Sequence, residues 1–199
     1  NHNSSDGAVI ISSSNLTITG GSFENNSGTG FLVKSEGTVM INDTTFTDNA
    51  NNGDLIAGRT IIVNGGSFAR NIDNKSVVNA SGDVIITDVV FEANKSRDSI
   101  IAATGNVTVT GGSFTENIGN QSVIDAGGDV TLENGVTFIE NESSDSVVSA
   151  NGDITVNVAG FERNQGAGSL LNSVNGDVLI DGSIFAGNTN TGDLIIGQS

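Results

Sequence analysis

Aspartates that follow glycine recur along the chain and are the residues best suited to bind a metal ion. Asp129, Asp153 and Asp177 each complete a Gly-Asp pair, and Asp83 and Asn106 hold the same place earlier in the chain. If these turns stack, their side chains lie about 5 Å apart, a spacing at which like charges repel. Oxygen ligands at that spacing would suit Ca²⁺, and we expect no other cofactor. The alternative, which we favour, is a column of solvated turn residues.

Catalytic chemistry is not predicted. Cleavage of a polysaccharide needs two or three carboxylates clustered on one outer face, often beside a basic residue. The acidic residues mostly fall in turns, the arginines are spread over different places, and the only histidine, His2, lies near the terminus. We therefore expect no catalytic residue, and we expect a protein that is not an enzyme. A carbohydrate-active protein, which binds or cleaves polysaccharide, is the alternative.

Asn-x-Ser/Thr sequences are acceptors for N-linked glycans in glycosylating secretory systems. The candidates that we expect to face outward are Asn15, Asn25, Asn42, Asn74, Asn79, Asn106 and Asn120. Asn94 and Asn141 also fit the pattern, but we expect their side chains to be inaccessible because both belong to the repeated motif described next.

The elements that must position all these residues follow from a repeated Phe-x-x-Asn motif. The pairs are Phe23/Asn26, Phe46/Asn49, Phe68/Asn71, Phe91/Asn94, Phe114/Asn117, Phe138/Asn141, Phe161/Asn164 and Phe185/Asn188. Successive phenylalanines are separated by 22 to 24 residues. A period of this length, kept over nearly the whole chain, is typical of a solenoid.

Aligning the repeats on their phenylalanines predicts short strands. Apolar residues recur two apart, as at Val107 and Val109, which is the spacing of one face of a strand. Frequent glycine and β-branched residues argue against helices. Three strands and three corners per turn predict a right-handed parallel β-helix of about nine turns, forming a single domain over residues 1–199. We expect the phenylalanines to stack in its core and the asparagines to form a hydrogen-bonded ladder at the next corner.

Composition excludes several classes of partner. The formal net charge of -16 disfavours nucleic acid, whose phosphates would be repelled. No apolar stretch is long enough to span a membrane. The chain has no Cys, Trp or Tyr, so disulfides and the usual aromatic anchors are absent. Abundant Asn, Ser, Thr and Gly suit a secreted, extracellular protein at a cell surface.

One outward column contains both apolar residues, three of them in consecutive turns, and threonines. Met40, Ile62, Ile85 and Leu179 belong to it, and an exposed apolar stripe of this kind can mark a lateral contact. The alternative is a set of ordinary isolated surface residues. The intervening threonines, Thr17, Thr108, Thr131 and Thr155, form an array too broken for ice binding.

The repeated Phe-x-x-Asn resembles the chlamydial polymorphic outer-membrane protein repeats, a type of autotransporter passenger. That family pairs the motif with Gly-Gly-Ala and an aliphatic residue. The corresponding places here read Asn52-Gly-Asp-Leu-Ile56, Asn120-Gln-Ser-Val-Ile124 and Gly168-Ser-Leu-Leu171, so this half is kept only loosely. The family also uses cysteines, which this chain lacks. The resemblance implies a surface-exposed passenger or adhesin-like β-helix.

Both ends of the sequence show strand-like residues without a polar cap, Ala8–Ile11 at one end and Asp193–Ile196 at the other. We expect the turns either to stack end to end on other copies or to continue into a longer solenoid. The prediction is a non-enzymatic secreted rod that is structural or adhesive, such as a filament subunit. Its expected partners are its own copies, end to end or laterally, and host-surface or matrix glycans.

Overall fold

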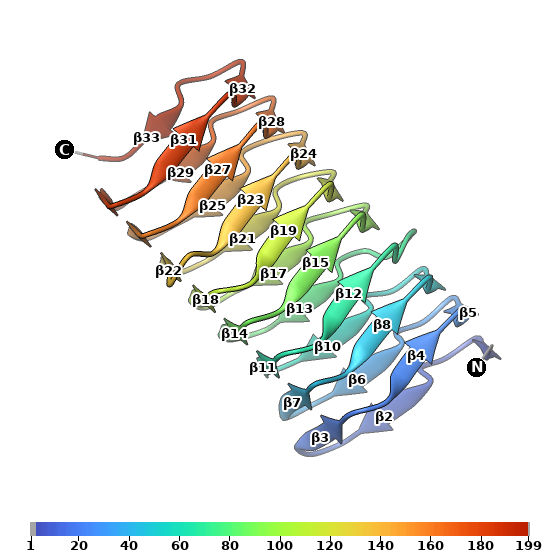
Figure 1. Cartoon of the computed structure of the whole chain (residues 1–199). Coiled ribbons are helices and arrows are strands. Elements are labelled where there is room, and N and C mark those ends of the chain that lie inside the picture. Colours follow the sequence, from blue (N-terminus) through green and yellow to red (C-terminus); the bar gives the residue numbers. More distant parts are fainter. Residues whose placement is uncertain (1–2, 199) are drawn as a thin grey trace.

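Successive turns of the chain stack, so that each strand pairs in parallel with strands one turn away (Figure 1). The computed structural model describes residues 3–198. These form about 8 turns of about 23 residues, without helix. The parallel solenoid predicted from the repeat is therefore confirmed, with about eight turns in place of about nine.

Each turn passes through three sheets, called first, second and third in chain order. The first sheet contains β2 (Ile10–Ser12), β6 (Val33–Ser35), β10 (Ile56–Gly58), β13 (Val78–Ala80), β17 (Ile101–Ala103), β21 (Ile124–Ala126), β25 (Val148–Ala150), β29 (Leu171–Ser173) and β33 (Ile195–Ile196). The second contains β3 (Leu16–Thr19), β7 (Thr38–Asn42), β11 (Thr60–Asn64), β14 (Val84–Thr87), β18 (Val107–Thr110), β22 (Val130–Glu133), β26 (Ile154–Asn157) and β30 (Val178–Asp181). The third contains β4 (Ser22–Glu24), β8 (Thr45–Thr47), β12 (Ser67–Ala69), β15 (Val90–Glu92), β19 (Ser113–Thr115), β23 (Thr137–Ile139), β27 (Gly160–Glu162) and β31 (Ile184–Ala186).

A fourth, two-residue strand follows the third sheet in most turns, which the three-strand prediction missed. One group of these corner strands contains β1 (Ser4–Ser5), β5 (Ser27–Gly28) and β9 (Ala50–Asn51). The other contains β16 (Lys95–Ser96), β20 (Ile118–Gly119), β24 (Glu142–Ser143), β28 (Gln165–Gly166) and β32 (Thr189–Asn190). The two groups are separated by one turn in which no corner strand forms.

Side-chain alternation along each strand builds the core. In β18, Val107 and Val109 are buried, while Thr108 between them is partly exposed. Val107 pairs in register with Val130 of β22, so equal residue types stack from turn to turn. The core is therefore a set of apolar columns that run along the axis of the solenoid.

The corner after the third sheet contains a left-handed backbone residue in each turn. This residue immediately precedes the motif asparagine, and its φ lies between 52° and 64°: Asn25, Asp48, Arg70, Ala93, Glu116, Glu140, Arg163 and Gly187. L-amino acids other than glycine adopt this conformation at a cost of about 1–2 kcal/mol. Interactions of the neighbouring asparagine must therefore hold the corner in place. None of the described residues forms a helix able to cross a membrane.

Candidate functional site

The motif phenylalanines form one continuous stack inside the solenoid. Neighbouring ring centroids lie 4.7 to 5.0 Å apart, and their planes differ by 6° or less. The rings from Phe46 to Phe161 have no solvent exposure, whereas Phe23 and Phe185 are partly buried. The spacing matches that of parallel strands, so strand pairing determines the geometry of the stack. These side chains pack the core and face no site.

The motif asparagines form a hydrogen-bonded ladder beside the stack. The backbone N–H and Nδ2 of Asn94 both donate to Oδ1 of Asn117, at 3.1 and 2.9 Å. Nδ2 of Asn94 also donates to the carbonyl oxygen of Phe68 at 2.8 Å. Its Oδ1 accepts from the backbone N–H and Nδ2 of Asn71. The amide thus uses both donor hydrogens and both acceptor lone pairs, and it has no capacity left for a ligand.

The same pattern connects each motif asparagine to the next. The ladder runs through Asn26, Asn49, Asn71, Asn94, Asn117, Asn141, Asn164 and Asn188. Asn3, which the motif search missed, extends it by one turn, because its backbone N–H and Nδ2 donate to Oδ1 of Asn26. The spacing of 23 residues between Asn3 and Asn26 was the available signal.

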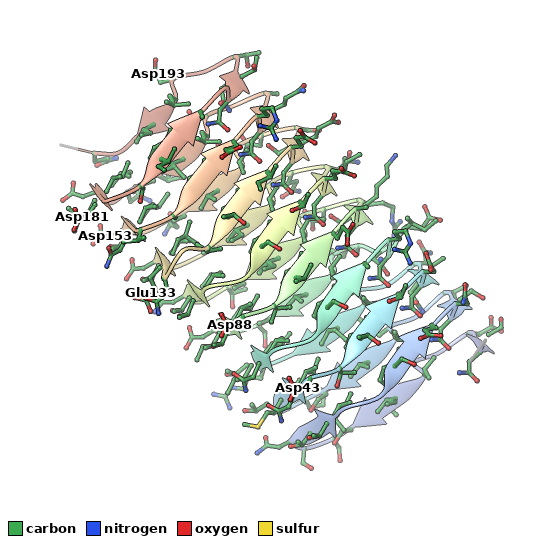
Figure 2. All side chains as sticks on the ribbon, viewed as in Figure 1. Asp43, Asp88, Glu133, Asp153, Asp181 and Asp193 are labelled. Carbon is green, nitrogen blue, oxygen red and sulfur yellow. The ribbon has the colours of Figure 1, made fainter. Side chains whose placement is uncertain are left out.

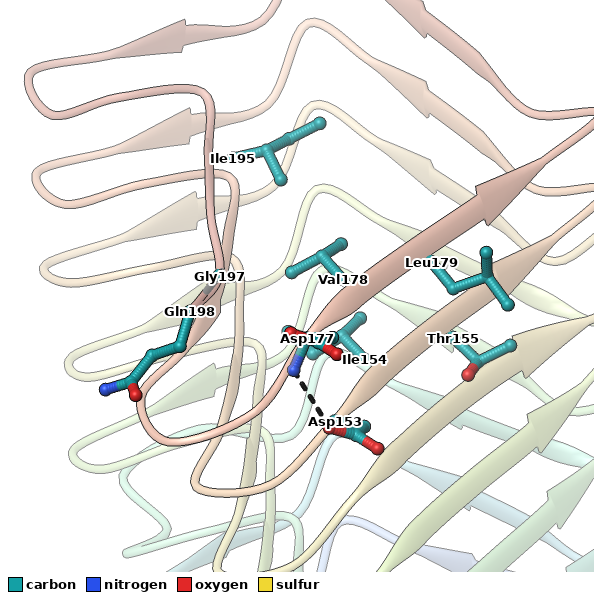
Figure 3. A pocket seen from close by; sticks show the side chains of 9 residues that line it. All are labelled: Asp153, Ile154, Thr155, Asp177, Val178, Leu179, Ile195, Gly197 and Gln198. Atoms are coloured by element: carbon teal, nitrogen blue, oxygen red, sulfur yellow. Dashed lines mark hydrogen bonds between the residues drawn. The ribbon is translucent and has the colours of Figure 1, made fainter.

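The aspartates predicted as candidate calcium ligands accept hydrogen bonds from the backbone of the next turn. Oδ1 of Asp129 accepts from the backbone N–H of Asp153 at 2.9 Å, and Oδ1 of Asp153 accepts from that of Asp177 at 2.9 Å (Figure 3). Asp83 and Asn106 make the same contact earlier in the column. All these residues are exposed. Within residues 3–198, no group of three or more acidic or histidine side chains is arranged to hold a metal ion.

Asp153 and Asp177 also line a hollow on the surface. It has a volume of about 650 Å³ and is bordered by Thr155, Leu179 and Ile195 among others (Figure 3). The carboxylate oxygens that do not accept a backbone bond are available to solvent there. Ca²⁺ binding at these aspartates stays a prediction.

A second groove, of about 540 Å³, is lined by three glutamates. Glu116 and Glu140 occupy the left-handed corner position of adjacent turns, and Glu142 lies just beyond in β24. Arg163 occupies the same corner position in the next turn, and its Nε donates to Oε1 of Glu140 at 2.7 Å. This hydrogen bond is the main cause of the raised pKa of Arg163. Nη1 of Arg163 also donates to Oε2 of Glu162 at 3.1 Å, so the arginine contacts one glutamate of the preceding turn and its own chain neighbour.

Acidic residues also line the corner between the second and third sheets, where Figure 2 shows Asp43, Asp88, Glu133 and Asp181 along one edge. Asp88 has a φ of 52°, and its Oδ1 lies where a Cβ on Gly111 of the next turn would be. Gly111 itself has a φ of 67°. A side chain at Gly65 or Gly111 would thus clash with the carboxylate of Asp43 or Asp88 in the turn before.

Comparison with known proteins agrees with this geometry. The family model described as "Right handed beta helix region" matches residues 1–136. The chain belongs to the right-handed β-helix family. No curated protein and no solved structure gives a significant match.

The candidate glycan acceptors of this β-helix differ in accessibility. Asn15, Asn25, Asn106 and Asn120 are exposed, and Asn42 and Asn79 are partly buried. Nδ2 of Asn79 donates to Oδ2 of Asp54 at 2.9 Å. Asn74 has no solvent exposure, so the prediction of an outward side chain there is wrong. Asn94 and Asn141 are also fully buried, as the ladder requires.

The outward column of the β-helix is continuous in register. Thr17, Met40, Ile62, Ile85, Thr108, Thr131, Thr155 and Leu179 pair in sequence along the second sheet. Ile85 is 40% exposed and Leu179 is 64% exposed, whereas Met40 and Ile62 are partly buried. Met40, Ile62 and Ile85 thus form a short apolar stripe in three consecutive turns, and Leu179 lies apart from them.

A groove of about 260 Å³ on the β-helix is lined by apolar and charged side chains, two of them cationic. It is lined by Phe31, Lys34 and Arg59 and floored by small residues such as Gly58 and Ala80. Nζ of Lys34 lies 5.2 Å from the centroid of the Phe31 ring, which supports a cation–π contact. Phe31 is the one phenylalanine outside the stack. This groove was not predicted, because its cations come from separate turns.

Two aspartates of the β-helix have raised pKa values: Asp125 lies in β21 of the first sheet, and Asp54 lies two residues before β10. Burial raises the pKa of Asp125, and the neighbouring Asp98 and Asp145 raise it further. Burial also raises the pKa of Asp54, although its Oδ1 accepts from the backbone N–H of Ser76 at 3.0 Å. Neither residue is paired with an opposite charge among the described residues.

Proposed function

We propose that this β-helix is a non-enzymatic rod of a secreted, extracellular protein, with a structural or adhesive role at a cell surface. The proposal rests on the hydrogen bonds that the repeated polar residues make within the protein. The asparagine ladder is buried and fully hydrogen-bonded, and the aspartate column caps the backbone of the next turn. Turn length varies by no more than two residues, so no long loop walls a cleft. A rod that only has to be long and stable needs no more than this.

The proposal includes a finer assignment and its partners. The repeated Phe-x-x-Asn resembles the chlamydial polymorphic outer-membrane protein type of autotransporter passenger, and we assign the chain to that kind of rod. Self-association, laterally along the stripe of Met40, Ile62 and Ile85 or end to end, would build filaments. Host-surface or matrix glycans are the second class of partner. The groove of Phe31, Lys34 and Arg59 offers them the Arg59 guanidinium and the Lys34 ammonium, the latter ion-paired with Glu36 at 3.3 Å.

Two measurements on the purified chain test the proposal. A glycan array, read for the chain and for Arg59→Ala, should show binding that weakens in the variant. Electron microscopy over a range of concentrations should show self-association that Ile62→Asp reduces. A chain that binds no glycan and remains monomeric at every concentration would overturn the structural or adhesive role.

A carbohydrate-active β-helix is the second candidate, and the groove of Glu116, Glu140 and Glu142 favours it. Glu116 and Glu140 are one turn apart in the same column, a separation of about 5 Å by the geometry of parallel strands. Retaining glycosidases hold their two carboxyl groups at about 5–5.5 Å. Opposing this, Arg163 is hydrogen-bonded to Glu140, and both side chains are about half exposed. The groove is thus a solvated surface rather than a water-excluded site.

A further inference from the structure

The corner strands of the solenoid are interrupted at a single turn, around residues 72–74. There, isolated bridges pair Ala50 with Ile72 and Asn74 with Ser96. Asp73 lies between the two bridged residues, is exposed and has a φ of 60°. The backbone therefore bulges at Asp73. The bulge places Asn74, rather than Asp73, on the inward side of the corner.

Polar side chains are buried on both sides of this bulge without partners. Asn51, Asn74 and Ser76 have no solvent exposure. Nδ2 and Oδ1 of both asparagines and Oγ of Ser76 form no hydrogen bond within the described part of the chain. The ladder asparagines are buried to the same extent but are fully paired, so depth alone does not cause the deficit.

Hydrogen bonds of neighbouring residues hold the two segments that carry these side chains together. The N–H of Ile72 donates to the carbonyl of Asn49 at 2.9 Å, and that of Lys75 donates to the carbonyl of Gly53 at 3.0 Å. The N–H of Ser76 donates to Oδ1 of Asp54. The segment that carries Asn74 and Ser76 is thus fixed on the segment that carries Asn51. Five unpaired polar atoms are gathered at one break in the corner.

We propose that ordered water occupies this break and bridges Asn51, Asn74 and Ser76. Buried polar groups without a protein partner are normally bonded to internal water, which needs two to four polar partners. A bound cation would serve the amide and hydroxyl oxygens but would leave both Nδ2 groups without an acceptor. Water accepts from the Nδ2 groups and donates to the Oδ1 atoms. The chemistry of the donor set therefore selects water over a metal ion.

The guanidinium of Arg97 closes the site on its outer side. Its Nε donates to the carbonyl of Asp73 at 3.1 Å, and its Nη2 donates to the carbonyl of Asn52. Arg97 thereby crosses from its own turn to the bulge and to the turn before it. A strap of this kind separates internal water from bulk solvent and lengthens its residence.

Water–protein cross-relaxation in NMR spectra of the intact chain tests the proposal. We expect cross-peaks from water to the Nδ2 hydrogens of Asn51 and Asn74. Asn94 and Asn117 are the internal controls, since they are equally buried and fully paired, and they should show none. A crystal structure should show density for water between Asn51, Asn74 and Ser76. Absent cross-peaks, or a direct bond between Asn51 and Asn74 that fills the break, would overturn the proposal.

Two variants provide a second readout. Asn74→Leu should lower the thermal midpoint by several degrees, because it leaves the water and Asn51 short of partners. If the site is dry, the same change removes an unpaired group and raises the midpoint. Arg97→Gln should shorten the residence time of the water several-fold. Arg70→Gln, which removes the ion pair with Asp48 on the same surface, should leave the residence time unchanged.

Discussion

The amide of Asn94 reaches two turns of the solenoid at once, since its Nδ2 donates to Oδ1 of Asn117 in the next turn and to the carbonyl of Phe68 in the preceding one. Asn94 follows a left-handed residue, Ala93, whose φ of 52° turns the chain at the corner. The amide bonds thus hold a backbone conformation that the local sequence does not favour. This relationship explains why the motif contains asparagine at each corner.

Asn117→Leu should lower the free energy of unfolding by about 3 kcal/mol or more. The change leaves the backbone N–H and Nδ2 of Asn94, and the carbonyl of Phe91, without their partners in a buried corner. Each buried unpaired group costs about 1–3 kcal/mol. Chemical denaturation measures the loss. The exposed Asn120→Leu is the control and should stay within about 0.5 kcal/mol of the parent chain.

Phe91→Ala should cost about 3–5 kcal/mol, the usual range for truncating a buried phenylalanine. Its ring has no solvent exposure and stacks at 4.9 Å on Phe68 and 4.8 Å on Phe114. Ile85→Ala, at an exposed position of the second sheet, should cost under about 1 kcal/mol. A loss below about 1 kcal/mol for Phe91→Ala in urea denaturation would mean that the stack contributes little.

Val158→Asn should stabilise the chain by about 0.5–1 kcal/mol. Val158 has a φ of 53°, a region that β-branched residues strongly disfavour, and its side chain is 53% exposed. Asn134 adopts a φ of 58° in the neighbouring turn, so asparagine fits this conformation. Val174→Asn is the control, because Val174 is similarly exposed but has no positive φ. Equal effects of the two substitutions on the melting temperature would argue against strain at Val158.

Asp125→Asn should stabilise the chain at pH 7 but not at pH 3. Burial and the carboxylates of Asp98 and Asp145 raise the pKa of Asp125 in the folded state. The native state then binds its proton more tightly than the unfolded state does, so stability falls as the pH rises from the ordinary pKa through the raised one. The amide variant lacks this loss. Denaturation curves at the two pH values check it, and an equal gain at both would contradict the electrostatic cause.

Asp153→Asn should leave stability nearly unchanged, whereas Asp153→Ala should cost about 1 kcal/mol. The amide oxygen can still accept from the backbone N–H of Asp177, as Asn106 does for Asp129, but alanine cannot. Thermal melts with added Ca²⁺ or chelator separate the two roles of the column. A midpoint that rises with Ca²⁺ in the parent chain, and not in Asp153→Asn, would establish a calcium site.

Features whose residues recur with the period of the repeat could be predicted from the sequence. Phe91 and Phe114, or Asn94 and Asn117, recur at one spacing, and parallel pairing converts that spacing into a stack or a ladder. The left-handed corner residues escaped prediction because Arg70, Ala93 and Glu116 share no side-chain property that favours a positive φ. The bulge at Asp73 escaped for a similar reason, since its corner has the same length and polarity as its neighbours. The stacking of the aspartates in one column was predicted. Their hydrogen bonds to the backbone depend on the orientation of each side chain, which the sequence pattern does not show.

We proposed above that this β-helix is a rod without catalytic activity. The most direct test is to incubate the chain with a panel of neutral and acidic polysaccharides and to measure newly formed reducing ends. We expect none above the level of the Glu116→Gln/Glu140→Gln variant, because the groove that holds these glutamates is solvated and Arg163 is bonded to one of them. Product formation by the parent chain that the double variant abolishes would contradict the claim and identify a carbohydrate-active enzyme.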